Sequence, residues 1–250
     1  MEIVAFIPES SKDWPGKLSA TVLVPGCNFR CPYCFTHSLV LFDKKLPRMD
    51  EKKFFESLLK SKGKVDSVTI TGGEPLIQGN SLVKFCEEVQ LAGFHVKLCT
   101  NGSNPELIEE LIQRELVDYF ALDIKTLFNP RKYFELTNKT AVLNRVRKSI
   151  QLVKRYSKDY EFITTLVPGI IAEKDILSLS FALQGSKRFV LQQFQSKYGT
   201  LSPQLEKIVD TPYEYLLNVA KKIEGIEEVR IRTIKGDEVI SSTKTLQLVK

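Results

Sequence analysis

The chain has 250 residues, of which 43% are hydrophobic and 26% charged, a composition typical of a globular protein with a full core. Its formal charge of +6 comes from 36 basic and 30 acidic residues that are interleaved, which argues against a nucleic-acid surface but is compatible with an acidic protein partner. No run of about 18 apolar residues and no secretory leader pattern occurs, so we expect a cytoplasmic protein without a membrane span.

The first predicted strands flank a turn-rich segment. Residues 2–7 indicate a short strand that ends at Pro8, and residues 18–24 are rich in β-branched side chains and predict the first strand of a barrel. Between them lies Trp14, the only tryptophan, which we expect to serve in packing.

Three thiols follow the 18–24 strand within one loop, Cys27-Asn28-Phe29-Arg30-Cys31-Pro32-Tyr33-Cys34. Thiolates are soft ligands that select zinc or iron–sulfur clusters, and three can reach one centre if the backbone wraps tightly around it. Disulfides would require an oxidising compartment, which a long, cysteine-poor chain does not indicate. Two readings stay open at this point: a zinc site completed by His37, and a four-iron cluster whose fourth iron is open to a substrate.

The next strand carries a glycine pair at its end. Asp50 is a candidate N-cap for a helix through about residue 61. Residues 65–71 predict a strand that runs into Gly72-Gly73-Glu74-Pro75, and a helix is predicted over 81–92. A glycine pair at the carboxyl end of a parallel strand permits close approach of a ligand, and a glutamate beside it can accept from an ammonium group.

Two further strands end in polar residues. Residues 94–100 predict a strand that ends in Thr100-Asn101-Gly102, followed by a helix that begins at Pro105. Residues 119–124 predict another, with Asp123 and Lys125 spaced to point to the same face, as an ion pair or a ligand clamp.

The remaining pattern continues the alternation of helix and strand. We expect helices over 141–156, 173–184 and 213–223, strands over 160–167 and 188–194, and a final strand over 229–233. Residues 195–210 form a loop long enough to be a lid or a partner-binding segment. Cys86 and Cys99 lie in apolar patterns and are expected to be core residues.

Six strand–helix units with their motifs at the carboxyl ends of the strands predict an α/β fold, a partial, open (β/α)6 TIM-like barrel with parallel strands and its site on one rim. We expect a single domain over 1–250, with a lead-in at 1–17, the barrel core at 18–195 and a C-terminal extension at 196–250.

The spacing Cys-x3-Cys-x2-Cys resembles the signature of the radical S-adenosylmethionine (SAM) superfamily. The resemblance implies that Cys27, Cys31 and Cys34 are the metal ligands and catalytic residues of a [4Fe-4S] cluster. It also implies that the methionine moiety of SAM binds the fourth iron, and that the reduced cluster cleaves SAM to a 5′-deoxyadenosyl radical.

The same resemblance implies which residues bind the cofactor. Gly-Gly-Glu-Pro resembles the element that contacts the amino group of the methionine moiety. Thr-Asn-Gly resembles the element that lies near the nucleoside of SAM, and Asp-Ile-Lys resembles the element at the methionine carboxylate. The expected SAM contacts are Tyr33, Gly72, Gly73, Glu74, Pro75, Thr100, Asn101, Asp123, Lys125, Val167 and Gln192.

A narrower likeness covers most of the chain. Residues 13–18, 25–34, 123–137 and 164–171 resemble the activating protein of anaerobic ribonucleoside-triphosphate reductase, a glycyl-radical-enzyme activase. This implies a glycyl-radical enzyme as protein substrate and a flavodoxin or ferredoxin as electron donor. The family often has His-Asn after the last cysteine, where this chain has Phe35-Thr36-His37.

Two other functions remain as alternatives. One is a radical SAM enzyme that acts on a small molecule or RNA, similar to a deazapurine synthase or a tRNA-modifying enzyme. The other is a zinc-stabilised binding module without catalytic activity.

Overall fold

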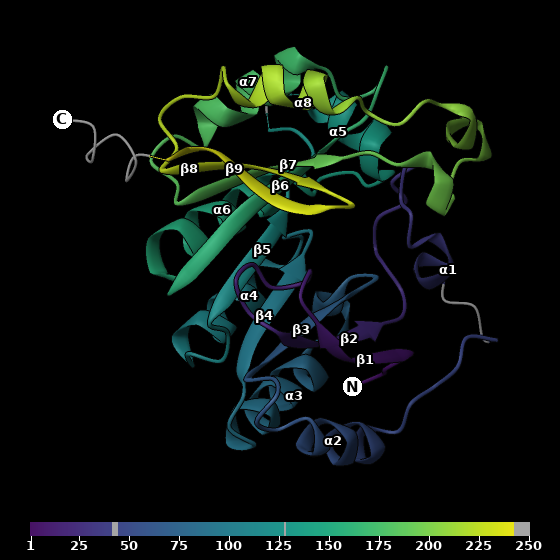
Figure 1. Ribbon diagram of the computed structural model, residues 1–250, viewed down its shortest axis with the longest axis vertical. Coiled ribbons are helices and arrows are strands. Elements are labelled where there is room, and N and C mark those ends of the chain that lie inside the picture. Colours follow the sequence, from purple (N-terminus) through teal and green to yellow (C-terminus); the bar gives the residue numbers. More distant parts are fainter. Residues whose placement is uncertain (42–44, 128, 243–250) are drawn as a thin grey trace. The chain divides into compact units, whose positions relative to one another are not determined.

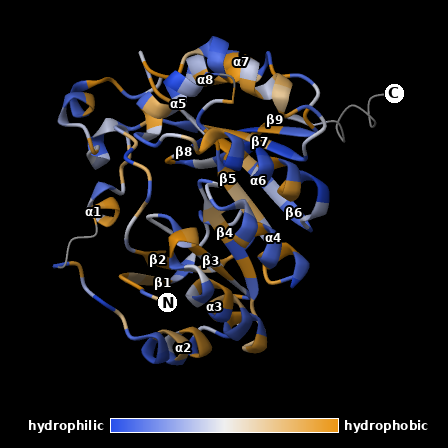
Figure 2. Ribbon diagram, turned by 180° about the vertical axis from the view of Figure 1, so that it is seen from behind, coloured by the Kyte–Doolittle hydropathy of each residue, from blue (hydrophilic) through white to orange (hydrophobic). Residues whose placement is uncertain are grey.

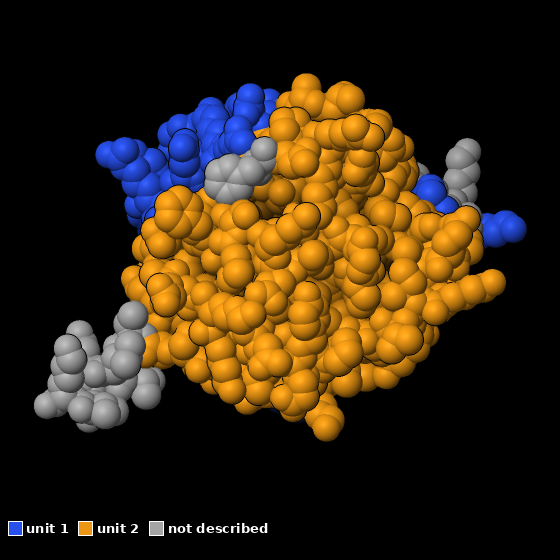
Figure 3. Space-filling view, turned by 90° about the horizontal axis from the view of Figure 1, so that it is seen from above, with its two compact units in different colours: residues 1–29, 36–122, 144–159 blue, residues 30–35, 123–143, 160–250 orange. Residues whose placement is uncertain are grey.

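The computed structural model describes residues 1–41, 45–127 and 129–242. The chain forms two compact units, coloured separately in Figure 3: unit 1 contains residues 1–29, 36–122 and 144–159, and unit 2 contains 30–35, 123–143 and the described residues from 160 onwards. The chain changes unit inside the cysteine loop, so Cys27 belongs to unit 1, and Cys31 and Cys34 belong to unit 2. The single domain expected from the sequence stays a prediction.

Unit 1 is built on parallel strands with one antiparallel strand at the edge (Figure 1). Its strands are β1 (Ala5–Ser10), β2 (Ser19–Val24), β3 (Ser67–Gly72), β4 (His95–Thr100) and β5 (Tyr119–Asp123), the last residue of which begins unit 2. β1 is antiparallel to β2, and β2 to β5 pair in parallel in sequence order. In this register Val24 lies opposite Gly72, so the cysteine loop and the Gly-Gly turn leave the sheet at the same edge.

The helices of unit 1 begin where the sequence places caps. They are α1 (His37–Val40), α2 (Glu51–Lys60), the 3₁₀-helix η1 (Pro75–Gln78), α3 (Asn80–Leu91), α4 (Pro105–Gln113) and α6 (Leu143–Tyr156), which begins at the boundary with unit 2. The Asp50 side chain accepts from the N–H groups of Lys52 and Lys53, as predicted for an N-cap. Asn104 caps α4 by accepting from Leu107, and Pro105 occupies the first turn.

Unit 2 repeats the parallel arrangement. Its strands are β6 (Asp159–Leu166), β7 (Arg188–Gln193), β8 (Glu228–Thr233) and β9 (Gly236–Ser242), and its helices are α5 (Pro130–Thr137), α7 (Glu173–Ala182), η2 (Ser196–Tyr198), η3 (Pro203–Lys207) and α8 (Tyr213–Ala220) (Figure 1). β6, β7 and β8 pair in parallel, and β9 is antiparallel to β8.

Apolar side chains of the strands form the core of each unit. Val68, Ile70, Val96 and Leu98 are fully buried in β3 and β4, and Figure 2 shows hydrophobic segments in both strands. Trp14 is also buried, with its ring 5.6 Å from that of Tyr119, so the expected packing role is confirmed. Cys86 is a core residue as predicted, and Cys99 is half-buried.

Some predicted boundaries were wrong. The first strand passes through Pro8 rather than ending there, because β1 is an edge strand and its pairing shifts between Ile7 and Ser10, which tolerates a residue without an N–H group. The strand over 229–233 is not the final one, because β9 follows it in a hairpin. Residues 36–48 contain the short helix α1, which was not predicted from the sequence, and part of this stretch lies outside the described residues. Among the described residues, no helix has the length and apolar composition needed to cross a membrane.

Candidate cofactor site

The Gly-Gly turn of unit 1 is hydrogen-bonded to the start of the cysteine loop. Gly73 N–H donates to Val24 O (2.9 Å), and Glu74 N–H donates to Gly26 O (2.8 Å). A Cβ atom on Gly73 would lie 1.8 Å from Gly26 O, so no larger residue fits against this backbone. The glycine therefore serves first to bring two segments of the chain together, beside Cys27.

Glu74 joins the ends of β3 and β4. Its carboxylate is almost completely buried; Oε1 accepts from Leu76 N–H (3.0 Å) and Thr100 Oγ1 (2.6 Å), and Oε2 accepts from Asn101 N–H (2.7 Å). Several charge-assisted hydrogen bonds are strong enough to fix two loop ends relative to each other. The contact with the methionine amino group stays a prediction, while Glu74 has an additional structural function within unit 1.

Asn101 connects this arrangement to the cysteine loop. Its Nδ2 donates to Asn28 Oδ1 (2.9 Å), and its Oδ1 accepts from the N–H of Ser103 (3.0 Å). Asn28 Nδ2 in turn donates to Ser103 Oγ (2.8 Å). The sequence interpretation missed Asn28 and Ser103, although a short amide next to a candidate cysteine ligand was a signal that could have found Asn28.

In unit 2 three predicted cofactor residues lie together. Lys125 is buried, its Nζ lies 2.5 Å from Asp123 Oδ2, and it stands 5.3 Å from the centre of the Tyr33 ring. Two polar atoms here, Asp123 Oδ1 and the Tyr33 hydroxyl, have no hydrogen-bond partner among the described residues. Buried polar groups in this state are commonly satisfied by a ligand or water.

The charges of this group follow from its surroundings. Burial is the largest single effect and acts to lower the pKa of Lys125, but Asp123, Tyr33 and Cys31 together raise the pKa well above its usual range. Burial raises the pKa of Tyr33, and this effect is larger than the lowering by the Lys125 ammonium, so the pKa lies well above its usual range. Unit 2 therefore presents an ammonium group, a carboxylate and a neutral phenol.

The cysteine loop is held by neighbours in each unit. In unit 1, Phe29 N–H donates to Cys27 Sγ (3.4 Å). In unit 2, Arg30 N–H donates to Thr137 O (2.7 Å), and Pro32 O accepts from Ser202 N–H (2.9 Å). Cys31 is buried, and Cys27 and Cys34 are half-buried.

The segment over 195–210 is more ordered than the predicted loop. It contains η2 and η3, and its two ends are joined because Asp210 Oδ1 accepts from Ser196 N–H (2.7 Å) and Thr211 N–H donates to Phe194 O (3.1 Å). Closed ends and internal packing are typical of an Ω-loop, and the Ser202 contact connects its middle to the cysteine loop. A role as lid or partner-binding segment stays a prediction.

The other predicted cofactor residues lie at strand ends. Val167 follows β6, and its carbonyl accepts from the N–H groups of Ile170 and Ile171; Gln192 is half-buried near the end of β7. Pro75 is buried in the first turn of η1. No set of three His, Cys, Asp or Glu side chains in the described ranges is arranged to hold a single metal ion.

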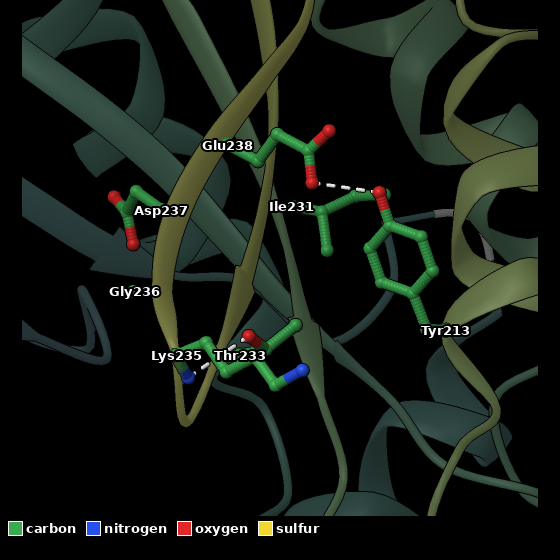
Figure 4. A pocket seen from close by; sticks show the side chains of 7 residues that line it. All are labelled: Tyr213, Ile231, Thr233, Lys235, Gly236, Asp237 and Glu238. Carbon is green, nitrogen blue, oxygen red and sulfur yellow. Dashed lines mark hydrogen bonds between the residues drawn. The ribbon is translucent and has the colours of Figure 1, made fainter.

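Unit 2 also contains a pocket of about 310 Å³ at the β8–β9 turn (Figure 4). Tyr213 Oη donates to Glu238 Oε2 (2.6 Å) on one wall, and the Asp237 carboxylate binds the Arg232 guanidinium through two contacts of 2.7 Å. These polar groups of the pocket wall therefore pair within the protein.

The comparison with known families decides between the readings of the cysteine loop. Residues 21–179 match the radical SAM superfamily. This chain belongs to that superfamily. It is a radical SAM enzyme that uses a [4Fe-4S] cluster and SAM, and its fold is the partial barrel of this superfamily, as the sequence predicted.

The similarity to individual relatives extends beyond the residues that match the family. A protein of Methanocaldococcus jannaschii named for glycyl-radical enzyme activation is 33% identical over 231 residues, covering 91% of this chain and 94% of the relative. A pyruvate formate-lyase-activating enzyme of Listeria monocytogenes is 34% identical over 137 residues, and the match spans 51% of this chain and 54% of that protein. A 7-carboxy-7-deazaguanine synthase of Clostridium acetobutylicum is 31% identical over 153 residues, covering 60% of this chain and 67% of the relative.

A solved structure supports the fold alone. The structure of TYW1 with a lysine-pyruvate adduct bound aligns over 85% of this chain and 75% of that chain with a TM-score of 0.60 at 15% sequence identity.

The residues present fit the cofactors. The Cys27–Cys34 loop contains three thiols, the kind of side chain that binds iron–sulfur clusters, and unit 2 offers a charged lysine near two polar atoms that have no hydrogen-bond partner among the described residues. Each assignment of a residue to the cluster or to SAM remains a prediction.

Proposed function

We propose that this enzyme activates a glycyl-radical enzyme by generating a radical on a glycine Cα of that partner. The observation that carries the proposal is the 33% identity to the M. jannaschii protein named for this activity, over 94% of its length. The partner we propose is an anaerobic ribonucleoside-triphosphate reductase, because residues 13–18 and 123–137 resemble the activating proteins of that reductase.

Each group of site residues has a function in this proposal. Cys27, Cys31 and Cys34 hold the cluster, which, when bound, supplies the electron that cleaves SAM to methionine and a 5′-deoxyadenosyl radical able to take the glycine hydrogen. Lys125 stays protonated and is suited to bind the methionine carboxylate. The remaining predicted contacts position SAM: Tyr33, Gly72, Gly73, Glu74, Pro75, Thr100, Asn101, Asp123, Val167 and Gln192.

The reaction needs two protein partners. One is the glycyl-radical enzyme, and the other is a flavodoxin or ferredoxin that supplies one electron for each SAM cleaved. We place the activity in the cytoplasm under oxygen-free conditions, because oxygen damages a cluster with an open iron.

Electron paramagnetic resonance (EPR) spectroscopy tests the proposal. The reconstituted protein, a reductant, SAM and the anaerobic reductase of the same genome are mixed without oxygen. We expect a glycyl doublet that requires SAM and disappears when the partner's glycine is replaced by alanine. SAM cleavage without a doublet on this reductase or on any other glycyl-radical enzyme of the genome would reject the proposal.

A second function is favoured by one observation, the 31% identity to 7-carboxy-7-deazaguanine synthase over 67% of that protein. In that case the substrate is a small molecule or RNA. Formation of 5′-deoxyadenosine would then rise with a nucleotide substrate in the absence of any protein partner.

A further inference from the structure

Cys27 lies between two residues that are both anchored to other loops of unit 1. On one side, Gly26 O accepts from Glu74 N–H (2.8 Å). On the other side, the Asn28 amide bonds to Asn101 (2.9 Å) and Ser103 (2.8 Å), 73 and 75 residues further along the chain. A residue fixed between two anchored neighbours has little freedom to change the direction of its side chain.

The three polar residues close a ring of hydrogen bonds. Asn28 bonds to Asn101 and to Ser103, and Asn101 Oδ1 accepts from Ser103 N–H (3.0 Å). Asn101 and Ser103 are buried, so a broken contact would leave a buried polar group without this partner. An amide suits the position between them because it accepts at Oδ1 and donates at Nδ2.

The ring also affects the environment of the Cys27 sulfur. Phe29 follows Asn28, and its N–H donates to Cys27 Sγ (3.4 Å). Hydrogen bonds to the thiolates of an iron–sulfur cluster change its reduction potential. Anchoring Asn28 therefore fixes both the direction of the Cys27 thiol and the N–H group that faces it.

We propose that Asn28 is a positioning residue for the cluster: its bonds to Asn101 and Ser103 hold Cys27 and the Phe29 N–H in the arrangement that receives iron. This function belongs to the superfamily chemistry of the protein and is independent of the substrate on which the enzyme acts.

The first test uses the full-length protein without its cluster. Iodoacetamide labelling mapped by mass spectrometry compares Cys27 with Cys34, the internal reference in unit 2. We expect Asn28→Ala to raise the ratio of Cys27 to Cys34 labelling about tenfold, and Ser103→Ala to raise it about threefold, since it removes one contact. Asn28→Asp should restore a ratio near that of the wild type, because a carboxylate can accept from both Asn101 and the Ser103 hydroxyl.

The second test uses the reconstituted holoprotein. Iron release to a chelator should accelerate most in Asn28→Ala, less in Ser103→Ala and little in Asn28→Asp. The EPR spectrum of the reduced cluster should change in Asn28→Ala. An unchanged labelling ratio and an unchanged spectrum in Asn28→Ala would overturn the proposal. If Asn28→Ala fails to fold, the soluble Ser103→Ala variant decides: a wild-type labelling ratio there would overturn it equally.

Discussion

The backbone of Gly73 lies so close to that of Gly26 that a Cβ atom on Gly73 would stand 1.8 Å from the Gly26 carbonyl oxygen. This contact joins the turn after β3 to the residue before Cys27. We expect Gly73→Ala to destabilise unit 1 by more than about 4 kcal/mol and to reduce iron incorporation, because two hydrogen-bonded backbone segments must separate.

The matched control is Gly63→Ala. Gly63 has a conformation that favours glycine, with φ of +91°, which Gly73 does not have, and no atom lies within 4 Å of its added Cβ. Gly63→Ala should lower the free energy of unfolding by only about 1–2 kcal/mol, because alanine must adopt a left-handed backbone conformation there. Urea unfolding of both variants measures the difference, and equal losses would show that the contact with Gly26 is unimportant.

A buried ion pair in unit 2 leads to a second prediction. Arg232 donates to Glu161 Oε2 (3.0 Å), and the Glu161 side chain is fully buried. Arg232→Met should destabilise the protein by about 3–5 kcal/mol, because the buried carboxylate loses this partner. Arg131→Met, which removes an exposed pair with Glu135 on α5, should cost less than about 0.5 kcal/mol. Similar melting temperatures for the two variants would contradict this account.

The Cys86 thiol should make stability depend on alkaline pH. Burial raises its pKa from 9.0 to about 12, so between these values the unfolded chain loses a proton that the folded chain retains. Below pH 9 this thiol does not affect the free energy of unfolding. Between pH 9 and about 12 the free energy of unfolding should fall by about 1.4 kcal/mol for each pH unit. Cys86→Ala adds a constant cavity cost but removes this dependence. Parallel plots of unfolding free energy against pH for the two proteins would refute the prediction.

Lys125 should contribute to the affinity for SAM. Burial acts to lower its pKa, but Asp123 together with Tyr33 and Cys31 raises the pKa well above the usual range, so the ammonium persists through neutral and moderately alkaline pH. Lys125→Met should weaken SAM binding roughly tenfold to a hundredfold, the value of a hydrogen bond to a charged group. Lys222→Met removes an exposed pair with Glu173 and serves as control. Calorimetric titration of reconstituted protein measures both, and wild-type affinity in Lys125→Met would exclude its assignment.

Local signals predicted most of the fold. The β-branched runs predicted β2 and β3, and Asp50 marked the beginning of α2, because strands and caps depend on neighbouring residues. β9 was missed because most of its residues are exposed and its sequence, Gly-Asp-Glu-Val-Ile-Ser-Ser, lacks the alternation of a strand with one buried face. Its pairing with β8 depends on the hairpin rather than on a core-facing pattern.

Only those parts of the candidate site that show as a short motif in the sequence could be predicted. The cysteine spacing indicated the cluster and the superfamily match agrees with it. The side-chain partners of Asn28 lie 73 and 75 residues away, a relationship that no local pattern contains. The sequence also could not reveal that the Glu74 carboxylate already bonds to Thr100 and Asn101.

The central claim is that the radical formed by this enzyme takes hydrogen from a glycine of a protein. Mass spectrometry of 5′-deoxyadenosine tests it most directly, with the proposed partner reductase produced from glycine deuterated at Cα. The account predicts 5′-deoxyadenosine that carries one deuterium, in an amount equal to the glycyl radical. Product formed in the presence of the labelled partner but free of deuterium would contradict it.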